Sequence, residues 1–247
     1  MIEGVVSTNK QGQSLGRKGL ATRGRLMNAT RQLLKTVSPI ELTAVSIAKQ
    51  AKTSSATFYM YFDDVKDIMF ALSREAASDL AAIEKIFDEP WDPKSIDYDR
   101  ALRLVEEFDA AWDRHREILR YRNLEADRGD ARFEEAKVQS YLPLIKKIAA
   151  HILSAYPEDN APKKSDAYAE AATLYAALEG VAEADPKVVN RGLGMKRMQQ
   201  ARARVIAHVL GRRGNGDGWY ASGKARSSRR KTTPKPSDEL VQASPQD

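Results

Sequence analysis

The chain has 247 residues, 42% of them hydrophobic, which is enough to bury a substantial core in one large domain or two modest ones. It contains no cysteine, which excludes disulfides, thiolate catalysis and cysteine-ligated zinc, and His115, His151 and His208 lie far apart without carboxylates at metal-ligand spacing. No apolar run approaches the roughly 20 residues that span a bilayer, and the N-terminal segment lacks the apolar centre of a secretion signal. We therefore expect a cytoplasmic globular protein with no metal, cofactor or membrane partner.

The net charge of +6 is unevenly distributed along the chain. Residues 1–25 carry five Lys or Arg against Glu3, residues 211–236 carry eight against Asp217, and the last eleven residues are acidic. The segment between the two basic ends has a small negative net charge. This layout suits binding to a polyanion, although two solubilising tails would give the same pattern.

Apolar residues at helical spacing predict an all-helical protein, with a first helix over residues 26–34 that ends before Ser38-Pro39. Thr43 is a good N-cap for a second helix of about two turns. A third short helix follows a tight break at Lys52-Thr53 and reaches Phe62, with Thr53 or Ser54 as its N-cap. Short helices joined by a minimal turn form a helix-turn-helix unit.

The third helix has two different faces. Phe58 and Phe62 lie four residues apart on one face and are expected to anchor the helix to its bundle. In a helix-turn-helix, the first residues of this helix meet base edges in the major groove, while tyrosine hydroxyls reach phosphate oxygens. We expect Tyr59 and Tyr61 to serve DNA in this way; the alternative is that they belong to the core with the phenylalanines.

Residues 21–72 resemble the DNA-binding domain of the TetR family of bacterial transcription regulators. The resemblance rests on register, spacing and residue type in Thr22-Arg23, Leu26 to Leu34, Thr43 with Ile47-Ala48, Thr57-Phe58-Tyr59 and Tyr61-Phe62. It implies a DNA-contacting set that comprises Arg23, Thr43, Ser54, Ser55, Ala56, Thr57, Tyr59, Met60, Tyr61 and Lys66. Because the position that can carry a base-reading arginine is Val45 here, we expect base reading to rest more on Ser55, Ala56, Thr57 and Met60.

Three further positions depart from the family pattern. The usual turn glycine is Lys52, the usual phosphate-contacting histidine is Tyr61, and the lysine at the start of the fourth helix is Val65, with Lys66 one place later. Lysine tolerates the left-handed turn conformation less well than glycine. Tyrosine keeps a hydrogen-bond donor but cannot become cationic.

Beyond the motif, periodicity predicts long amphipathic helices: a fourth over residues 68–83, a fifth over 102–112, a sixth near 118–121 and a seventh over 133–153. Strand-like alternation and glycine-rich phosphate loops are absent from the sequence, which argues against Rossmann and P-loop folds. No nucleophile, base and acid set is visible, so we expect neither catalytic residues nor enzyme activity.

The resemblance implies that the second domain is a helical bundle that binds a small-molecule inducer. Phe108, Trp112, Tyr121 and Tyr141 are the aromatic candidates for lining its pocket, although aromatic residues at helical spacing also form ordinary cores. The sequence identifies no particular ligand.

The resemblance also implies that the last two long helices form a four-helix bundle with a second copy of the chain. The predicted dimerisation residues are Ala171, Leu174, Tyr175, Leu178, Met198, Val205 and Val209. Packing of both helices within one protomer is the alternative.

The sequence therefore predicts an all-α protein: an N-terminal three-helix helix-turn-helix domain, followed by a helical ligand-binding and dimerisation domain. The expected limits are a flexible basic arm over 1–20, the DNA-binding domain over 21–72, the second domain over 73–211 and a disordered basic tail over 212–247. We expect a homodimeric repressor that a small-molecule effector releases from a palindromic operator in double-stranded DNA. The alternative is a DNA-binding interaction protein of the same fold that serves nucleoid organisation or division control.

Overall fold

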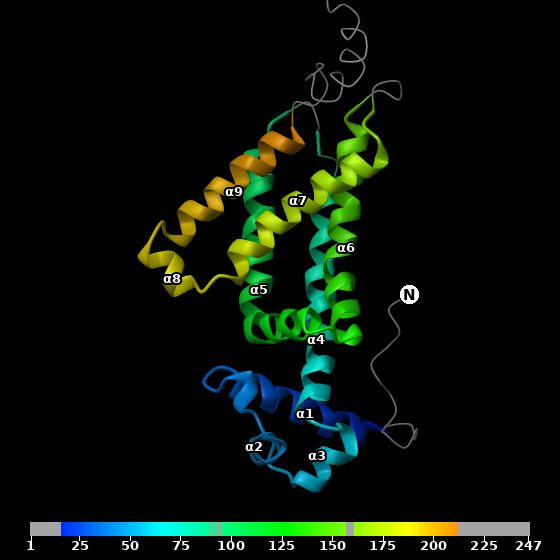
Figure 1. Cartoon of the computed structure of the whole chain (residues 1–247), viewed down its shortest axis with the longest axis vertical. Helices are drawn as coiled ribbons and strands as arrows, with labels where there is room; N and C mark the ends of the chain where they lie inside the picture. The colour runs from blue at the N-terminus through cyan, green and yellow to red at the C-terminus, as the bar shows by residue number, and fades with distance from the viewer. Residues whose placement is uncertain (1–15, 90, 93–94, 157–160, 212–247) are drawn as a thin grey trace, which may run out of the picture.

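The computed structural model describes residues 16–89, 91–92, 95–156 and 161–211, and these residues are helical without any strand (Figure 1). The elements in chain order are α1 (Arg17–Leu33), η1 (Pro39–Glu41), α2 (Ala44–Gln50), α3 (Ser55–Tyr61), α4 (Val65–Ala81), η2 (Ala82–Phe87), α5 (Tyr98–Asp127), α6 (Ala131–Ser154), α7 (Lys164–Glu183), α8 (Pro186–Arg191) and α9 (Met195–Leu210). Helices α1 to α3 form the lower end of the molecule in Figure 1, here called the head, and α5 to α9 form the body. Helix α4 connects them. The predicted all-helical fold class is confirmed.

Short polar side chains set where the head helices begin. Thr43 accepts a hydrogen bond from the Ser46 backbone N–H at 3.0 Å, while the Thr43 N–H donates to Ser46 Oγ at 3.1 Å, which closes a capping box. Ser54 accepts from the Thr57 N–H at 3.1 Å, and Asp64 caps α4 in the same way. Each cap satisfies an N–H group that has no partner inside the helix. The predicted caps at Thr43 and Ser54 are thus confirmed.

The turn between α2 and α3 depends on a left-handed residue. Lys52 has φ of 54° and is the one non-glycine residue with positive φ among those described. The Lys52 N–H donates to the Lys49 carbonyl at 3.1 Å, and the Thr53 N–H donates to the Ala48 carbonyl at 2.9 Å, so the end of α2 is satisfied. A side chain in this backbone region costs roughly 1 kcal/mol or more.

The head closes over a small apolar core. Leu26, Ile47 and Phe58 are fully buried, and Phe62 is almost so. The rings of Phe58 and Phe62 lie 5.8 Å apart, as their spacing of four residues on one face predicts. The anchoring role of this pair is confirmed.

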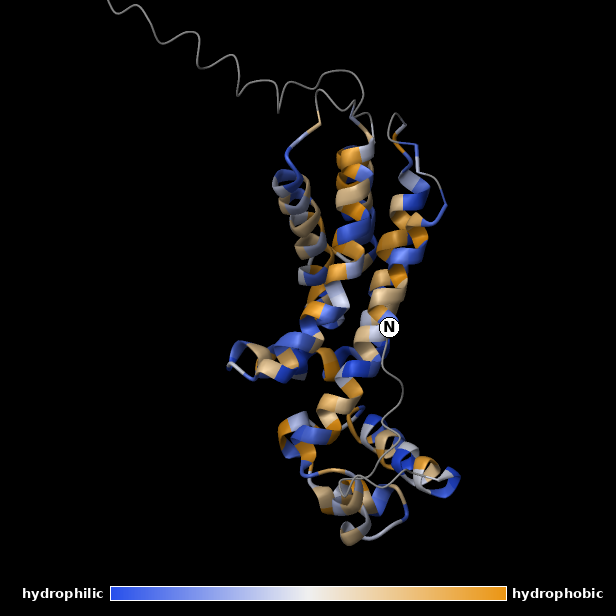
Figure 2. Cartoon of the chain, turned by 90° about the vertical axis from the view of Figure 1, so that its right-hand side faces the viewer, coloured by the Kyte–Doolittle hydropathy of each residue, from blue (hydrophilic) through white to orange (hydrophobic). Residues whose placement is uncertain are grey.

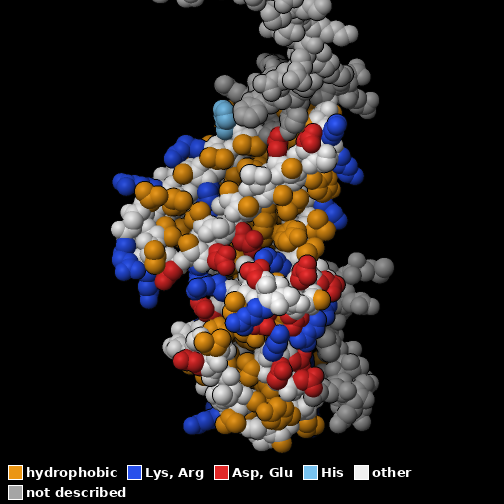
Figure 3. All heavy atoms as spheres, viewed as in Figure 1, with side chains coloured by type: hydrophobic (Ala, Val, Ile, Leu, Met, Phe, Trp, Pro, Cys, Tyr) orange, Lys and Arg blue, Asp and Glu red, His pale blue; other side chains and the backbone are white. Residues whose placement is uncertain are grey.

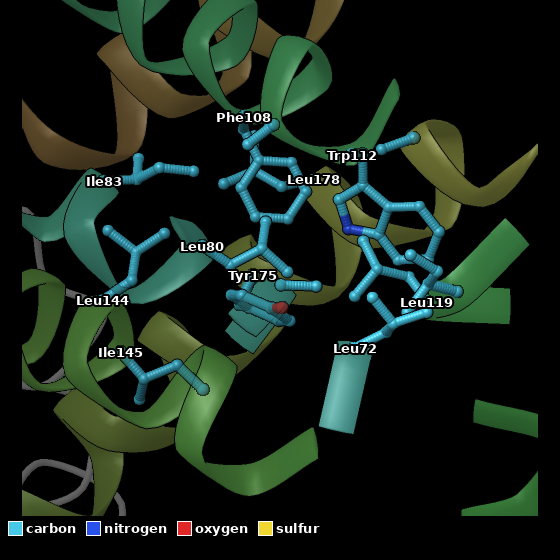
Figure 4. Packing of buried hydrophobic residues seen from close by; sticks show 14 of the residues in the cluster. Leu72, Leu80, Ile83, Phe108, Trp112, Leu119, Leu144, Ile145, Tyr175 and Leu178 are labelled. Atoms are coloured by element: carbon cyan, nitrogen blue, oxygen red, sulfur yellow. The ribbon is translucent and has the colours of Figure 1, made fainter. Parts of the chain in front are cut away.

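One face of helix α4 is buried along its length, from the head to the body. Ile68, Leu72 and Leu80 are at most 1% exposed, and α4 packs against both α5 and α6. Hydrophobic and hydrophilic residues alternate along the long helices (Figure 2), as expected where one face of each is buried. In the body core, Phe108, Trp112 and Tyr175 lie among aliphatic side chains from α4, α5, α6 and α7 (Figure 4).

Some boundaries differ from those that periodicity predicts. Helix α1 begins at Arg17, inside the segment expected to be a flexible arm, and its first turn is closed by the Leu20 N–H donating to the Gly16 carbonyl at 3.1 Å. The predicted fifth and sixth helices form one helix, α5, because the residues between their apolar stretches include the good helix formers Arg114, Arg116 and Glu117 and no glycine or proline. The short α8 was not predicted. The rest of the predicted arm, residues 1–15, and the predicted tail, 212–247, lie outside the described residues.

Candidate nucleic-acid interface and body core

The exposed side of α3 carries the side chains predicted to meet DNA. Tyr59 is 52% exposed and Met60 is 55% exposed, and Ala56 is also exposed. Ser55 and Thr57 are half-buried. Tyr59 stands edge-on against the Phe58 ring, with ring centroids 5.4 Å apart, so the core residue beneath it limits its orientation.

Several hydroxyl groups in the predicted DNA-contacting set already have partners within the head. Ser54 Oγ lies 3.0 Å from Thr57 Oγ1 and also accepts the Thr57 N–H. The Thr43 hydroxyl accepts the Ser46 N–H. These side chains are exposed or half-buried, but their first structural role is to cap α2 and α3.

Arg23 and Tyr61 are less available than the exposed residues of α3. The Arg23 guanidinium lies 5.1 Å from the centroid of the Phe62 ring and donates to Met27 Sδ at 3.1 Å. Partial burial lowers the pKa of Arg23. Tyr61 is half-buried and packs against the core. Its burial therefore does not decide between a contact with DNA and a place in the core.

Lys66 requires a correction, because its ammonium group is directed to the body. Its Nζ lies 2.7 Å from Glu125 Oε2 and 2.8 Å from Asp130 Oδ2. Hydrogen bonding, first to Asp130 and then to Glu125, raises the pKa of Lys66, and the same contacts lower the pKa values of both carboxyl groups. Arg128 and Arg132 pair with these carboxylates from the other side. Lys66 therefore joins the first turn of α4 to the α5–α6 connection rather than pointing into solvent.

The rest of the head supplies positive charge without concentrating it on α3. Arg17, Lys18, Arg25, Lys49 and Lys52 are exposed and are spread over α1, α2 and the turn. In the space-filling view, hydrophobic side chains gather at the lower end of the molecule, where α2 and α3 lie (Figure 3). The surface expected to face DNA therefore combines an apolar tip with scattered cationic groups.

Three of the four predicted pocket aromatics belong to one region of the body. The Tyr175 ring lies 5.6 Å from both the Phe108 ring and the Tyr141 ring, and Trp112 is fully buried nearby in the same core (Figure 4). Tyr121 does not join them. Its ring lies 5.7 Å from Phe133, beside the contact between Phe133 and Phe70 of α4. Tyr121 therefore packs at the junction with α4, apart from the other three aromatics, and its place in a pocket stays a prediction.

A buried polar cluster that the sequence analysis missed lies beside Tyr175. The fully buried Arg122 donates to Ser140 Oγ at 2.8 Å, to Asn123 Oδ1 at 2.9 Å and to Glu179 Oε1 at 3.3 Å. Burial lowers the pKa of Arg122 and raises the pKa of Glu179 and of the Tyr175 phenol. Arg122 follows Leu119 by three residues and Ile118 by four, so helical spacing places it on the same apolar face. This position was the signal in the sequence that Arg122 could be buried.

A second buried ion pair fixes α9 to α5. Both terminal guanidinium nitrogens of Arg202 donate to the Asp109 carboxylate, at 2.9 Å and 2.6 Å, and Gln199 donates to the same carboxylate at 2.9 Å. Arg202 also donates to the Leu178 carbonyl at 3.1 Å, which adds α7 to the contact. The two-pronged geometry is that of a strong, orientation-specific pair.

The predicted dimerisation face of α7 is wrong. Ala171, Leu174, Tyr175 and Leu178 are at most 5% exposed and pack inside the protomer, where α7 lies against α6 and α5. The exposed side of α7 is instead formed by small residues, namely Ala169, Ala172, Thr173, Ala176, Ala177 and Gly180. On α9, Val205 is 54% exposed and Met198 and Val209 are half-buried, so these three remain predictions for an interface.

The described residues contain neither a metal-binding cluster nor a membrane-spanning helix. No group of three or more His, Asp or Glu side chains there could hold a metal ion. No helix in the same part of the chain is both long and apolar enough to cross a bilayer.

Comparison with known proteins identifies the body. Residues 83–214, more than half of the chain, match the model of the tetracyclin repressor-like C-terminal domain. No curated protein sequence matches the chain.

Solved structures share the fold at low sequence identity. GusR of Salmonella enterica is 19% identical with a TM-score of 0.55, over 77% of this chain and 96% of its own. A protein of unknown function from Rhodococcus sp. RHA1 is 20% identical with a TM-score of 0.57, over 76% and 95%. FadR of Bacillus subtilis, in complex with stearoyl-CoA, is 14% identical with a TM-score of 0.55, over 76% and 96%.

The family match covers the body, and the capped helices of the head supply the helix-turn-helix that precedes it. The family is non-enzymatic, in agreement with the absence of a catalytic set from the sequence. This chain belongs to the TetR family and is a transcriptional regulator.

Proposed function

We propose that this regulator is a homodimeric repressor that binds a palindromic operator and is released by a small-molecule effector. The observation that carries the proposal is the continuity of α4, which begins beside α3 and ends in the body core. A change in body packing can move this helix and, with it, the recognition helix. Effector binding then shifts the equilibrium between two arrangements of the heads.

The body core supports an effector site between α5, α6 and α7. Trp112 Nε1 and the Tyr175 hydroxyl are buried and have no hydrogen-bond partner of normal geometry among the described residues, although Ser140 lies beside Tyr175. Buried donors without acceptors are costly, so an effector that supplies an acceptor beside these aromatic rings would gain affinity. With Phe108 and Tyr141, these residues form the proposed effector site.

The effectors of structural relatives are consistent with an apolar molecule that has a polar group. One relative was solved with stearoyl-CoA and another, SmeT, with triclosan, each at about 15% identity or less to this chain. At this level of sequence identity, the comparison supports a shared fold but not a shared effector. The apolar core around Trp112 is the local reason to propose a similar class of effector here.

The exposed sides of α7 and α9 support the proposed homodimer. The small residues on α7 allow another helix to approach closely, and Val205 adds an exposed apolar side chain on α9. Two copies related by a two-fold axis would pair these faces into a four-helix bundle and present two heads to two half-sites of a palindrome.

Genomic footprinting of the full chain tests this function. A small number of palindromic sites near promoters is expected, with occupancy that falls when the cognate effector is present. Hundreds of scattered sites without a common sequence would contradict specific repression and would favour nucleoid organisation.

A further inference from the structure

The recognition helix of this protein has an unusual chemical composition. From Thr53 to Phe62 there is no Arg, Lys, Asn, Gln, Asp or Glu. The side chains that α3 exposes are those of Ala56, Tyr59 and Met60, with Tyr59 and Met60 each more than half exposed. The first charged residues after the helix, Asp63 and Asp64, are acidic and exposed.

This composition restricts which bases the helix can read. Guanine is recognised in the major groove mainly by paired hydrogen bonds from Arg or Lys, and adenine by paired hydrogen bonds from Asn or Gln. Helix α3 has none of these side chains. The one major-groove feature that an apolar side chain recognises directly is the C5 methyl group of thymine.

The serine and threonine hydroxyl groups at the start of α3 do not replace the missing amide and guanidinium groups. The Thr57 and Ser54 oxygens lie 3.0 Å apart and bond each other, and Ser54 also accepts the Thr57 N–H. Ser55 is half-buried. A single hydroxyl can donate or accept, so it distinguishes bases poorly even where it is free.

The cationic side chains that could contact phosphates lie on other parts of the head. The exposed cations Arg17, Lys18, Arg25, Lys49 and Lys52 lie on α1, on α2 and in the turn. Contacts of this kind position a protein on the duplex and carry no sequence information. The exposed cations therefore lie apart from the exposed side chains of α3.

We propose that α3 reads thymine methyl groups through Met60 and Ala56, so that the operator half-site contains consecutive A·T pairs where the helix lies in the major groove. This inference rests on the proposed operator binding and adds the chemistry of its selectivity. The tip of the head is apolar (Figure 3), which fits a groove surface lined with methyl groups.

The experiment begins with the DNA that the protein itself selects. The full chain is incubated with a randomised 40-base-pair duplex library, and the enriched sequence is synthesised twice, once with thymine and once with deoxyuridine at the A·T pairs of each half-site. Deoxyuridine keeps base pairing and removes only the C5 methyl. Burial of one methyl group corresponds to about a fourfold change in affinity, so binding should fall about fourfold for each contacted methyl.

Variants connect the loss to the proposed side chain. Met60→Ala should bind the thymine duplex more weakly and should lose most of its sensitivity to deoxyuridine. Ile40→Ala is the matched control, because Ile40 is 77% exposed but lies on η1, which contacts α5. It should keep full sensitivity. Met60→Arg should shift the selected sequence towards guanine in the same half-site.

The outcomes separate this inference from the function on which it rests. Thymine reading is supported if the enriched sequence is A·T-rich and wild type binds its deoxyuridine duplex more weakly than its thymine duplex. The Met60→Ala variant should not show this loss. An enriched sequence bound equally in both forms overturns thymine reading and leaves operator binding intact. A library with no enriched sequence overturns both.

Discussion

Lys66 Nζ lies 2.7 Å from Glu125 Oε2, so the first turn of α4 is paired with the last turn of α5 across the boundary between head and body. Asp130, the N-cap of α6, accepts from the same ammonium group at 2.8 Å. The Lys66 ammonium also lies 5.8 Å from the Phe133 ring centroid. The junction between α4 and the body therefore combines charged groups with the aromatic rings of Phe70, Tyr121 and Phe133.

Replacement of Lys66 tests this assignment. Lys66→Met should lower the free energy of unfolding by no more than about 1 kcal/mol, because the pair is partly exposed to solvent. The slope of log affinity for operator DNA against log salt should stay unchanged, because the ammonium does not face a phosphate. A slope that falls in magnitude by about 0.9 for each subunit would return Lys66 to the DNA interface.

The stabilising effect of the junction should depend on pH with a defined sign. The pKa of Asp130 is lowered from 3.8, chiefly by Lys66, so its contribution is present above that value and is lost as the pH falls through the lowered pKa. The pKa of Lys66 is raised from 10.5, chiefly by Asp130, so its contribution is present below that value and is lost as the pH rises through the raised pKa. The difference in melting temperature between wild type and Lys66→Met should be constant from about pH 5 to 10 and shrink outside it. A constant difference down to strongly acid pH would contradict the ion pair.

The turn residue offers a stabilising substitution. Lys52 has φ of 54°, which glycine adopts without a Cβ clash. Lys52→Gly should raise the free energy of unfolding by roughly 0.5–1 kcal/mol, after the entropy of the more flexible unfolded chain is counted. The matched control Lys49→Gly, inside α2, should lower it by about 1 kcal/mol. Urea unfolding measures both, and a destabilised Lys52→Gly would show that the lysine side chain has a structural role of its own.

The buried pair between Asp109 and Arg202 should be costly to break from one side. Arg202→Met leaves the Asp109 carboxylate without its guanidinium, and the expected loss is about 3–5 kcal/mol. The double variant Asp109→Asn with Arg202→Met should cost less than the two single losses combined, because the unpaired charge is gone. Arg204→Met is the control, since Arg204 is exposed on the same helix, and it should change stability by less than about 0.5 kcal/mol. Additive losses in urea unfolding would show that the two residues do not interact.

The proposed dimer face predicts different fates for neighbouring residues of α7. Ala176→Arg places a charge on the exposed small face and should give a folded monomer with much weaker operator binding. Leu178→Arg places it in the protomer core and should unfold the body. Ala110→Arg, at an exposed position of α5, should remain dimeric. Light scattering and circular dichroism measure the outcome, and a dimeric Ala176→Arg would move the interface elsewhere.

Local signals in the sequence determined the head. Thr43 and Ser54 have the chemistry of N-caps, and the spacing of Phe58 and Phe62 defines a buried face, so residues close in sequence were sufficient to place α2 and α3. Residues of the same segment also gave the resemblance to the TetR family. They also fixed the composition of the recognition helix, which determines what it can read.

Only the tertiary structure decided what packs against the apolar face of each body helix and where the long charged side chains point. Periodicity identified the apolar face of α7 through Leu174, Tyr175 and Leu178, but it could not tell whether a second copy of the chain or the same protomer covers that face. Lys66 and Arg122 find their partners 59 and 57 residues away in sequence, at Glu125 and Glu179 respectively. Such pairs depend on how helices cross, and this follows from the packing of the whole core rather than from any local pattern.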